Sequence, residues 1–84
     1  MESITLICFF NLIDSYKRQG TVEVKKRQFE QSKDLYDRIK LGILYIETGD
    51  VRRGVNILDD ICATEPDLII THALKQYLKE VTSN

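Results

Sequence analysis

The side chains that could do chemistry are few and lie apart in this sequence. His72 is the only histidine, and its neighbours Thr71 and Ala73 supply neither a nucleophile nor a set of metal ligands. Asp59 and Asp60 form a carboxylate pair, but adjacent residues of a helix point about 100° apart, which favours two solvated charges over an acid/base pair. The sequence therefore predicts no catalytic, cofactor or metal site, and we expect a protein that is not an enzyme.

The cysteines and the charge narrow the functional classes further. Cys8 and Cys62 lie in apolar surroundings without a Cys-x-x-Cys or Cys/His cluster, so we expect two buried, reduced thiols. The formal net charge of −1 gives no overall field that would attract nucleic acid. One basic cluster remains, made of Lys17, Arg18, Lys25, Lys26 and Arg27. We interpret it as a solvated face, and the alternative is a small helical nucleic-acid-binding or regulatory protein that uses residues 17–27.

The composition is typical of one small helical domain that spans residues 1–84. Apolar residues make up 43% of the chain and charged residues 30%, which excludes a disordered or membrane-embedded composition. A single proline and four glycines leave long uninterrupted segments, which favour helices over short strands. The apolar run at residues 4–10 is shorter than the roughly 20 residues of a membrane span, and no signal-peptide features surround it. We expect it to form the most buried helix of a soluble, cytoplasmic protein.

Turn and capping residues divide the chain into four or five helices. We expect them at about residues 3–19, 22–33, 34–48, 51–64 and 67–81. The expected N-terminal caps are Ser3, Thr21, Ser32 or Asp34, and Asp50, and the expected stops are Gly20, Gly49 and Pro66. No proline or glycine separates residues 22–33 from residues 34–48. These two segments therefore either fuse into one long helix or break near Ser32.

The stretch from residue 41 to residue 66 predicts a helical hairpin that ends at a proline. Its defining residues are Leu41, Gly42, Tyr45, Gly49, Gly54, Leu58 and Pro66. This pattern over about residues 35–68 resembles one tetratricopeptide repeat (TPR), an antiparallel pair of helices. In that family the glycine at 42 allows close helix contact, and the position of Gly54 usually holds alanine. Arg38 and Ile61 depart from the family's aromatic and small residues, which fits a divergent repeat better than a regular array.

A second, degenerate copy of the motif lies upstream. Residues 16–22 and residues 45–51 both read Tyr-x-x-x-Gly-x-Val, at an offset of 29 residues. The usual TPR spacing is about 34 residues, so the connection between the two copies would be short. A chance match of so short a pattern is the alternative explanation.

The TPR resemblance implies a concave groove that binds another protein. Its expected groove positions are Ile7, Phe10, Tyr36, Ile39, Ile43, Ile46 and Glu47. The stripe from Tyr36 to Ile46 is either ordinary core or a partner surface, and we favour the partner surface because the opposite side of the same segment is also apolar. The natural ligand is an amphipathic helix. The chain is similar in this to the small TPR-like chaperones of type III secretion, which hold an export subunit and often work with a second small helical protein. Self-association is a further expectation.

Overall fold

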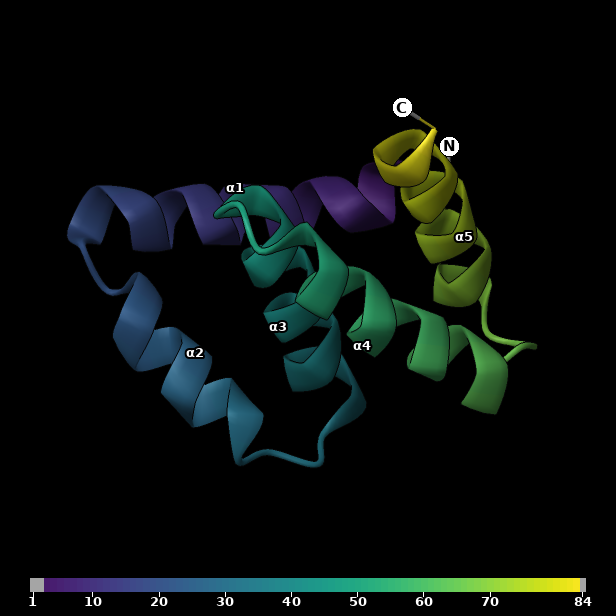
Figure 1. The fold of residues 1–84 in the computed structure, drawn as a ribbon, viewed down its shortest axis with the longest axis horizontal. Coiled ribbons are helices and arrows are strands. Elements are labelled where there is room, and N and C mark those ends of the chain that lie inside the picture. The colour runs from purple at the N-terminus through teal and green to yellow at the C-terminus, as the bar shows by residue number, and fades with distance from the viewer. Residues whose placement is uncertain (1–2, 84) are drawn as a thin grey trace.

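The computed structural model describes residues 3–83, with side chains from residue 6 onward, and folds this part of the chain into five α-helices without a strand. The helices are α1 Ser3–Gln19, α2 Val22–Glu30, α3 Leu35–Glu47, α4 Val51–Thr64 and α5 Ile69–Thr82 (Figure 1). The predicted all-α fold of antiparallel helical hairpins is confirmed. The capping predicted for the side chain of Ser3 lies outside the described side chains.

The connection between α2 and α3 is a short turn at residues 31–34. The Asp34 carboxylate accepts a hydrogen bond of 3.2 Å from the backbone N–H of Asp37, and the Ser32 hydroxyl donates to the Asp37 carboxylate at 2.8 Å. The first bond satisfies one of the N–H groups that the start of a helix leaves without a partner, and the second holds Ser32 against the first turn of α3. The predicted break near Ser32 is confirmed, and the fused long helix is wrong.

The tightest helix contact joins α3 and α4 at two glycines. A Cβ atom on Gly42 would lie 2.6 Å from Leu58 Cδ2, and one on Gly54 would lie 2.5 Å from Ile46 Cγ1. A Cβ atom on Gly54 would also collide with the carbonyl oxygen of Gly42, so the two backbones touch. The predicted close approach at Gly42 is confirmed. The alanine that the TPR family places at the position of Gly54 does not fit here.

The turns that end α1 and α3 have the same conformation. Gly20 and Gly49 both have positive φ, 70° and 103°. The residue after each glycine donates its N–H to the carbonyl of the tyrosine five positions earlier, at 3.0 Å for Tyr16 and 2.9 Å for Tyr45. This arrangement is a Schellman motif, in which glycine avoids the cost of the left-handed conformation. The turn predicted twice from the Tyr-x-x-x-Gly-x-Val pattern is therefore present twice.

The helix packing of the two hairpins does not repeat in the same way. Ile13 and Lys25 lie 29 residues before Gly42 and Gly54, so the first hairpin has side chains where the second has a backbone contact. Accordingly α1 and α2 diverge from their shared turn (Figure 1), whereas α3 and α4 are in close contact at Gly42 and Gly54.

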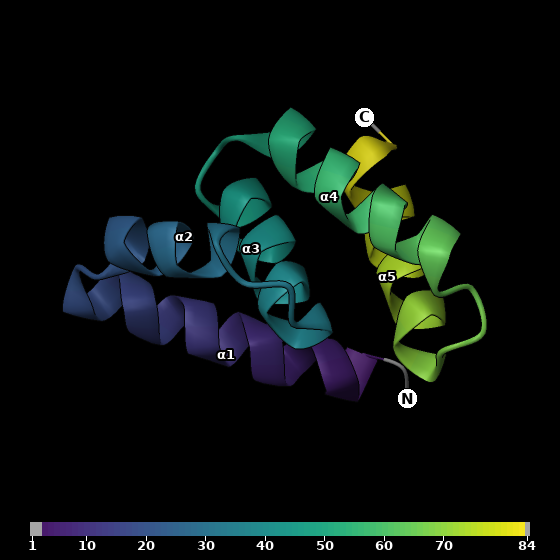
Figure 2. The ribbon, with the colours of Figure 1, turned by 90° about the horizontal axis from the view of Figure 1, so that it is seen from below.

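The last helix closes the fold by returning to α1. α5 packs on α4 and also on α1, which brings it to the N-terminal end of the first helix (Figure 2). The rings of Phe10 and Tyr77 join these two helices at a centroid distance of 5.3 Å. The core between the helices includes completely enclosed side chains from four of them: Ile13, Ile39, Ile43, Leu44, Leu58, Thr71 and Leu74. The chain thus forms a closed bundle.

Two capping predictions are wrong in detail. Thr21 and Asp50 occupy the expected N-cap positions of α2 and α4, but neither side chain makes a cap hydrogen bond. The Asp50 carboxylate instead lies 3.5 Å from the Arg53 guanidinium, one turn into the helix. Thr21 and Asp50 each directly follow a glycine turn. The backbone of that turn already leads into the next helix, so no side-chain hydrogen bond is needed there.

None of the helices within residues 3–83 is long and apolar enough to cross a membrane.

We predict that Gly42→Leu destabilises the fold by roughly 1–3 kcal/mol, because the new side chain must displace Leu58 from the α3–α4 contact. Chemical denaturation followed by circular dichroism measures this free energy of unfolding. Ala63→Leu, which adds the same side chain at an exposed position of α4, is the control and should change stability much less. Equal stability of the two variants would contradict the packing described for Gly42.

Candidate protein-binding surface

A pocket of about 400 Å³ lies between the first turn of α3 and the start of α5. Its lining residues are Tyr36, Asp67, Leu68, Ile69 and Ile70. Ile69 is 80% exposed and Tyr36 is 55% exposed, the two highest values among the large apolar side chains described. We call this feature the Tyr36–Ile69 pocket. Its wall is apolar apart from Asp67, so it is suited to hold an apolar side chain from another molecule.

Local structure fixes both sides of the pocket. On the α3 side the Asp34 cap sets the first helical turn, and the Tyr36 ring stacks on the Phe9 ring of α1 at 6.5 Å and 16°. On the α5 side the buried Thr71 hydroxyl donates to the carbonyl of Glu65, which fixes the turn around Pro66. Ile70 faces the core from the start of α5, so the preceding Ile69 must face outward, about 100° around the helix.

Three of the predicted groove residues are buried within the chain itself. Ile39 and Ile43 have no exposed surface, and Ile46 is buried where it fills the space beside Gly54. The interpretation of this stripe as an open groove is therefore wrong, and these residues belong to the core. The physical reason is that other helices of the same chain surround α3: it packs on α1, α2 and α4, and α5 packs on α1 and α4.

The other four predicted site residues are at least partly accessible. Tyr36 lines the pocket, and Ile7 on α1 is 47% exposed. Phe10 is half-buried against Tyr77. Glu47 accepts a 2.8 Å hydrogen bond from the Tyr77 hydroxyl, so one of its carboxylate oxygens already has a partner within the chain. Burial, and then this bond to Glu47, raise the pKa of Tyr77 well above its ordinary value.

The chemically reactive side chains do not converge in the described structure. His72, Asp59 and Asp60 are exposed, and residues 3–83 contain no group of three or more His, Cys, Asp or Glu side chains placed to hold a metal. Cys62 is buried as predicted, and burial raises the pKa of its thiol. Cys8 is exposed, so the expectation of two buried thiols is wrong for this residue.

In the basic cluster at residues 17–27, two side chains contact aromatic rings of the same chain and three are exposed. The Lys25 ammonium lies 5.1 Å from the centre of the Tyr16 ring, and that of Lys26 lies 5.0 Å from the Tyr45 ring. These two cations make contacts inside the chain, while Lys17, Arg18 and Arg27 remain exposed. The five residues therefore do not form one continuous basic face.

Sequence reasoning missed two apolar residues that line the pocket, Leu68 and Ile69. The available signal was the adjacent pair at residues 69 and 70, because only one of two neighbouring apolar residues at the start of a helix can face the core. Their position opposite Tyr36 depends on the path of the chain after Pro66, which no local pattern specifies.

The raised pKa of Tyr77 predicts a loss of stability at alkaline pH. Above about pH 10 an unfolded chain releases the tyrosine proton while the folded chain keeps it, so the free energy of unfolding falls as pH rises. Tyr77→Phe should lose about 1 kcal/mol less than the wild type between about pH 9 and about pH 11 in denaturation experiments. Tyr36→Phe, which removes a hydroxyl from an exposed ring, is the control for the substitution itself. Identical pH profiles for wild type and Tyr77→Phe would contradict this prediction.

Comparisons of the chain with protein families, with curated proteins and with solved structures give no match.

Proposed function

We propose that this chain is a protein-binding module without enzymatic activity, and that the Tyr36–Ile69 pocket is its contact with a partner. The observation that carries the proposal is the exposure of Ile69, 80% accessible at the edge of an apolar pocket. A large apolar side chain gains about 25 cal/mol for each Å² removed from water, so its exposure beside another exposed ring favours association.

The size and shape of the pocket suit an amphipathic helix. About 400 Å³ accepts one or two large side chains, which a helix presents from positions three or four residues apart. Tyr36 can cover the inserted side chain with its ring, and Asp67 supplies a charged rim that favours a basic residue next to it.

The resemblance of residues 35–68 to a TPR hairpin supports the same functional class. A finer form of the proposal is a small cytoplasmic chaperone or adaptor that works in a hetero-oligomer. A type III secretion export subunit, held through an apolar helix, is one partner of this kind. Because the α3 stripe is buried, such a helix would bind at the edge of the Tyr36–Ile69 pocket. It would not lie in the groove that was expected from the sequence.

We predict that Ile69→Asp abolishes partner binding and leaves the fold intact, because a charge in an apolar interface costs several kcal/mol, while residue 69 contributes little to the core. Affinity capture of the tagged full chain from its native host, followed by quantitative mass spectrometry, measures binding. The captured protein should fall by more than tenfold for Ile69→Asp. Melting temperatures of the wild type and the variant should agree within a few degrees.

The matched control is Val24→Asp, which places the same charge on α2 at an apolar side chain that is 49% exposed. It should retain capture at the wild-type level. Equal capture by wild type and Ile69→Asp would contradict the assignment of the pocket as the partner contact. If both variants lost capture equally, the loss would come from the added negative charge and would not show a contact at residue 69.

A further inference from the structure

α2 contributes two apolar side chains to the core, the buried Phe29 and the partly buried Val22. Phe29 is its only buried residue, compared with seven buried residues in α3. Val24 points to solvent with 49% of its surface exposed. A helix of nine residues has little stability in isolation. Contacts of α2 with the rest of the chain, other than apolar burial, must therefore hold it in place.

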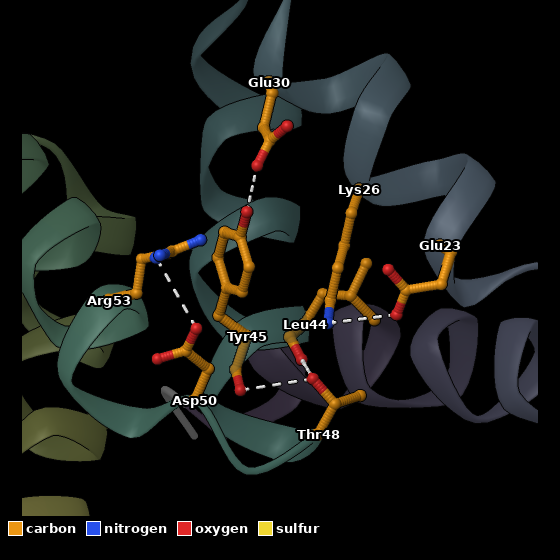
Figure 3. A network of polar contacts seen from close by, with 8 residues as sticks. All are labelled: Glu23, Lys26, Glu30, Leu44, Tyr45, Thr48, Asp50 and Arg53. Atoms are coloured by element: carbon orange, nitrogen blue, oxygen red, sulfur yellow. Dashed lines mark hydrogen bonds and ion pairs between the residues drawn. The ribbon is translucent and has the colours of Figure 1, made fainter.

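Polar and aromatic contacts supply that attachment (Figure 3). The Tyr45 hydroxyl of α3 donates a hydrogen bond to Glu30 at the end of α2, and the Lys26 ammonium lies over the face of the Tyr45 ring. On the α1 side, Lys25 lies over the Tyr16 ring. Cation–π contacts at partly exposed sites are worth roughly 0.5–1 kcal/mol each, which makes every one of these contacts easy to exchange.

The anchor of α2 is the ring of Phe29. It lies 6.2 Å from the Tyr16 ring, and the Lys40 ammonium lies 5.4 Å from its centre. Within residues 3–83, α2 packs only on α1 and α3. α2 takes no part in the other helix contacts, which are α3 with α4, α4 with α5, and α1 with α3 and α5.

We propose that the surface beneath α2 is a second binding site, which the chain's own α2 occupies in this structure. We call this surface the α2 slot and define it by Tyr16, Lys40 and Tyr45. The chemistry of α2 specifies the external ligand. It is a short helix from a partner protein that carries one aromatic residue for the position of Phe29 and lysine or arginine three or four residues earlier, over the tyrosine rings. The inference is independent of the Tyr36–Ile69 pocket.

The first test asks whether α2 opens while the other helices stay folded. Tyr45→Phe removes the hydrogen bond to Glu30 and keeps the ring. Amide hydrogen exchange, measured by NMR on the full chain, should become roughly fivefold or more faster in α2, and less than twofold faster in α3 and α4. Tyr77→Phe is the matched control, because it removes the other tyrosine–glutamate bond, between Tyr77 of α5 and Glu47 of α3, and should leave α2 unchanged. Equal acceleration of α2, α3 and α4 in Tyr45→Phe would overturn the proposal.

The second test supplies α2 as a separate ligand. The probe is a fluorescent peptide of residues 21–33, and the receiver is the full chain carrying Phe29→Ala, whose own α2 has lost its anchor. Fluorescence anisotropy should show at least tenfold tighter binding to this receiver than to the wild type, where the attached α2 competes at a high effective concentration. The peptide should bind at least tenfold more weakly when it carries Phe29→Ala, or Lys25→Glu together with Lys26→Glu. Equal binding of all three peptides would overturn the proposal. Loss of cooperative unfolding in the Phe29→Ala receiver would also overturn it, because the other helices would then depend on α2.

Discussion

The contact between the backbones of α3 and α4 at Gly42 and Gly54 is the constraint on which the rest of this structure depends. With no side chain on either residue, the helices approach until Leu58 and Ile46 fill the space beside the opposite backbone. This contact orients the hairpin, and the hairpin carries the surfaces to which the other helices attach: α1 and α2 pack on α3, and α5 packs on α4. The closed core follows from that arrangement, and so do the positions of the Tyr36–Ile69 pocket and the α2 slot.

The parts of the fold that short-range signals specify could be predicted from the sequence. Gly20 and Gly49 set two turns of the same kind. The break between α2 and α3, which the structure places at the Asp34 cap, was one of two alternatives that the sequence left open. The close contact at Gly42 also follows from local pattern, because a glycine inside a helix costs about 1 kcal/mol relative to alanine and needs a packing reason. Each of these features depends on residues within a few positions of one another or on a single hairpin.

The environment of the α3 stripe could not be predicted, since it depends on where distant segments fold. An apolar face on two sides of a helix indicates either a partner or coverage by the same chain. Ile39 and Ile43 are covered by the same chain, because α1, α2 and α4 pack on α3. α5 joins α1 and α4 in turn, through contacts between residues as far apart as Phe10 and Tyr77. The same long-range path created the pocket at Ile69. The structure thus contains the α3–α4 hairpin and the two glycine turns expected from the sequence, while the α3 stripe from Ile39 to Ile46 lies in a closed core.

Replacement of Gly54 by alanine tests the central constraint most directly, because two physical effects predict opposite signs. Helix propensity alone would stabilise α4 by about 1 kcal/mol, and alanine is also the residue that the TPR family usually has here. The backbone contact predicts instead that Gly54→Ala lowers the free energy of unfolding by about 1–3 kcal/mol, since the new methyl group would collide with the Gly42 carbonyl and Ile46. Urea denaturation of the wild type, Gly54→Ala and the exposed control Asn56→Ala measures the difference. A Gly54→Ala variant as stable as the wild type, or more stable, would contradict the account.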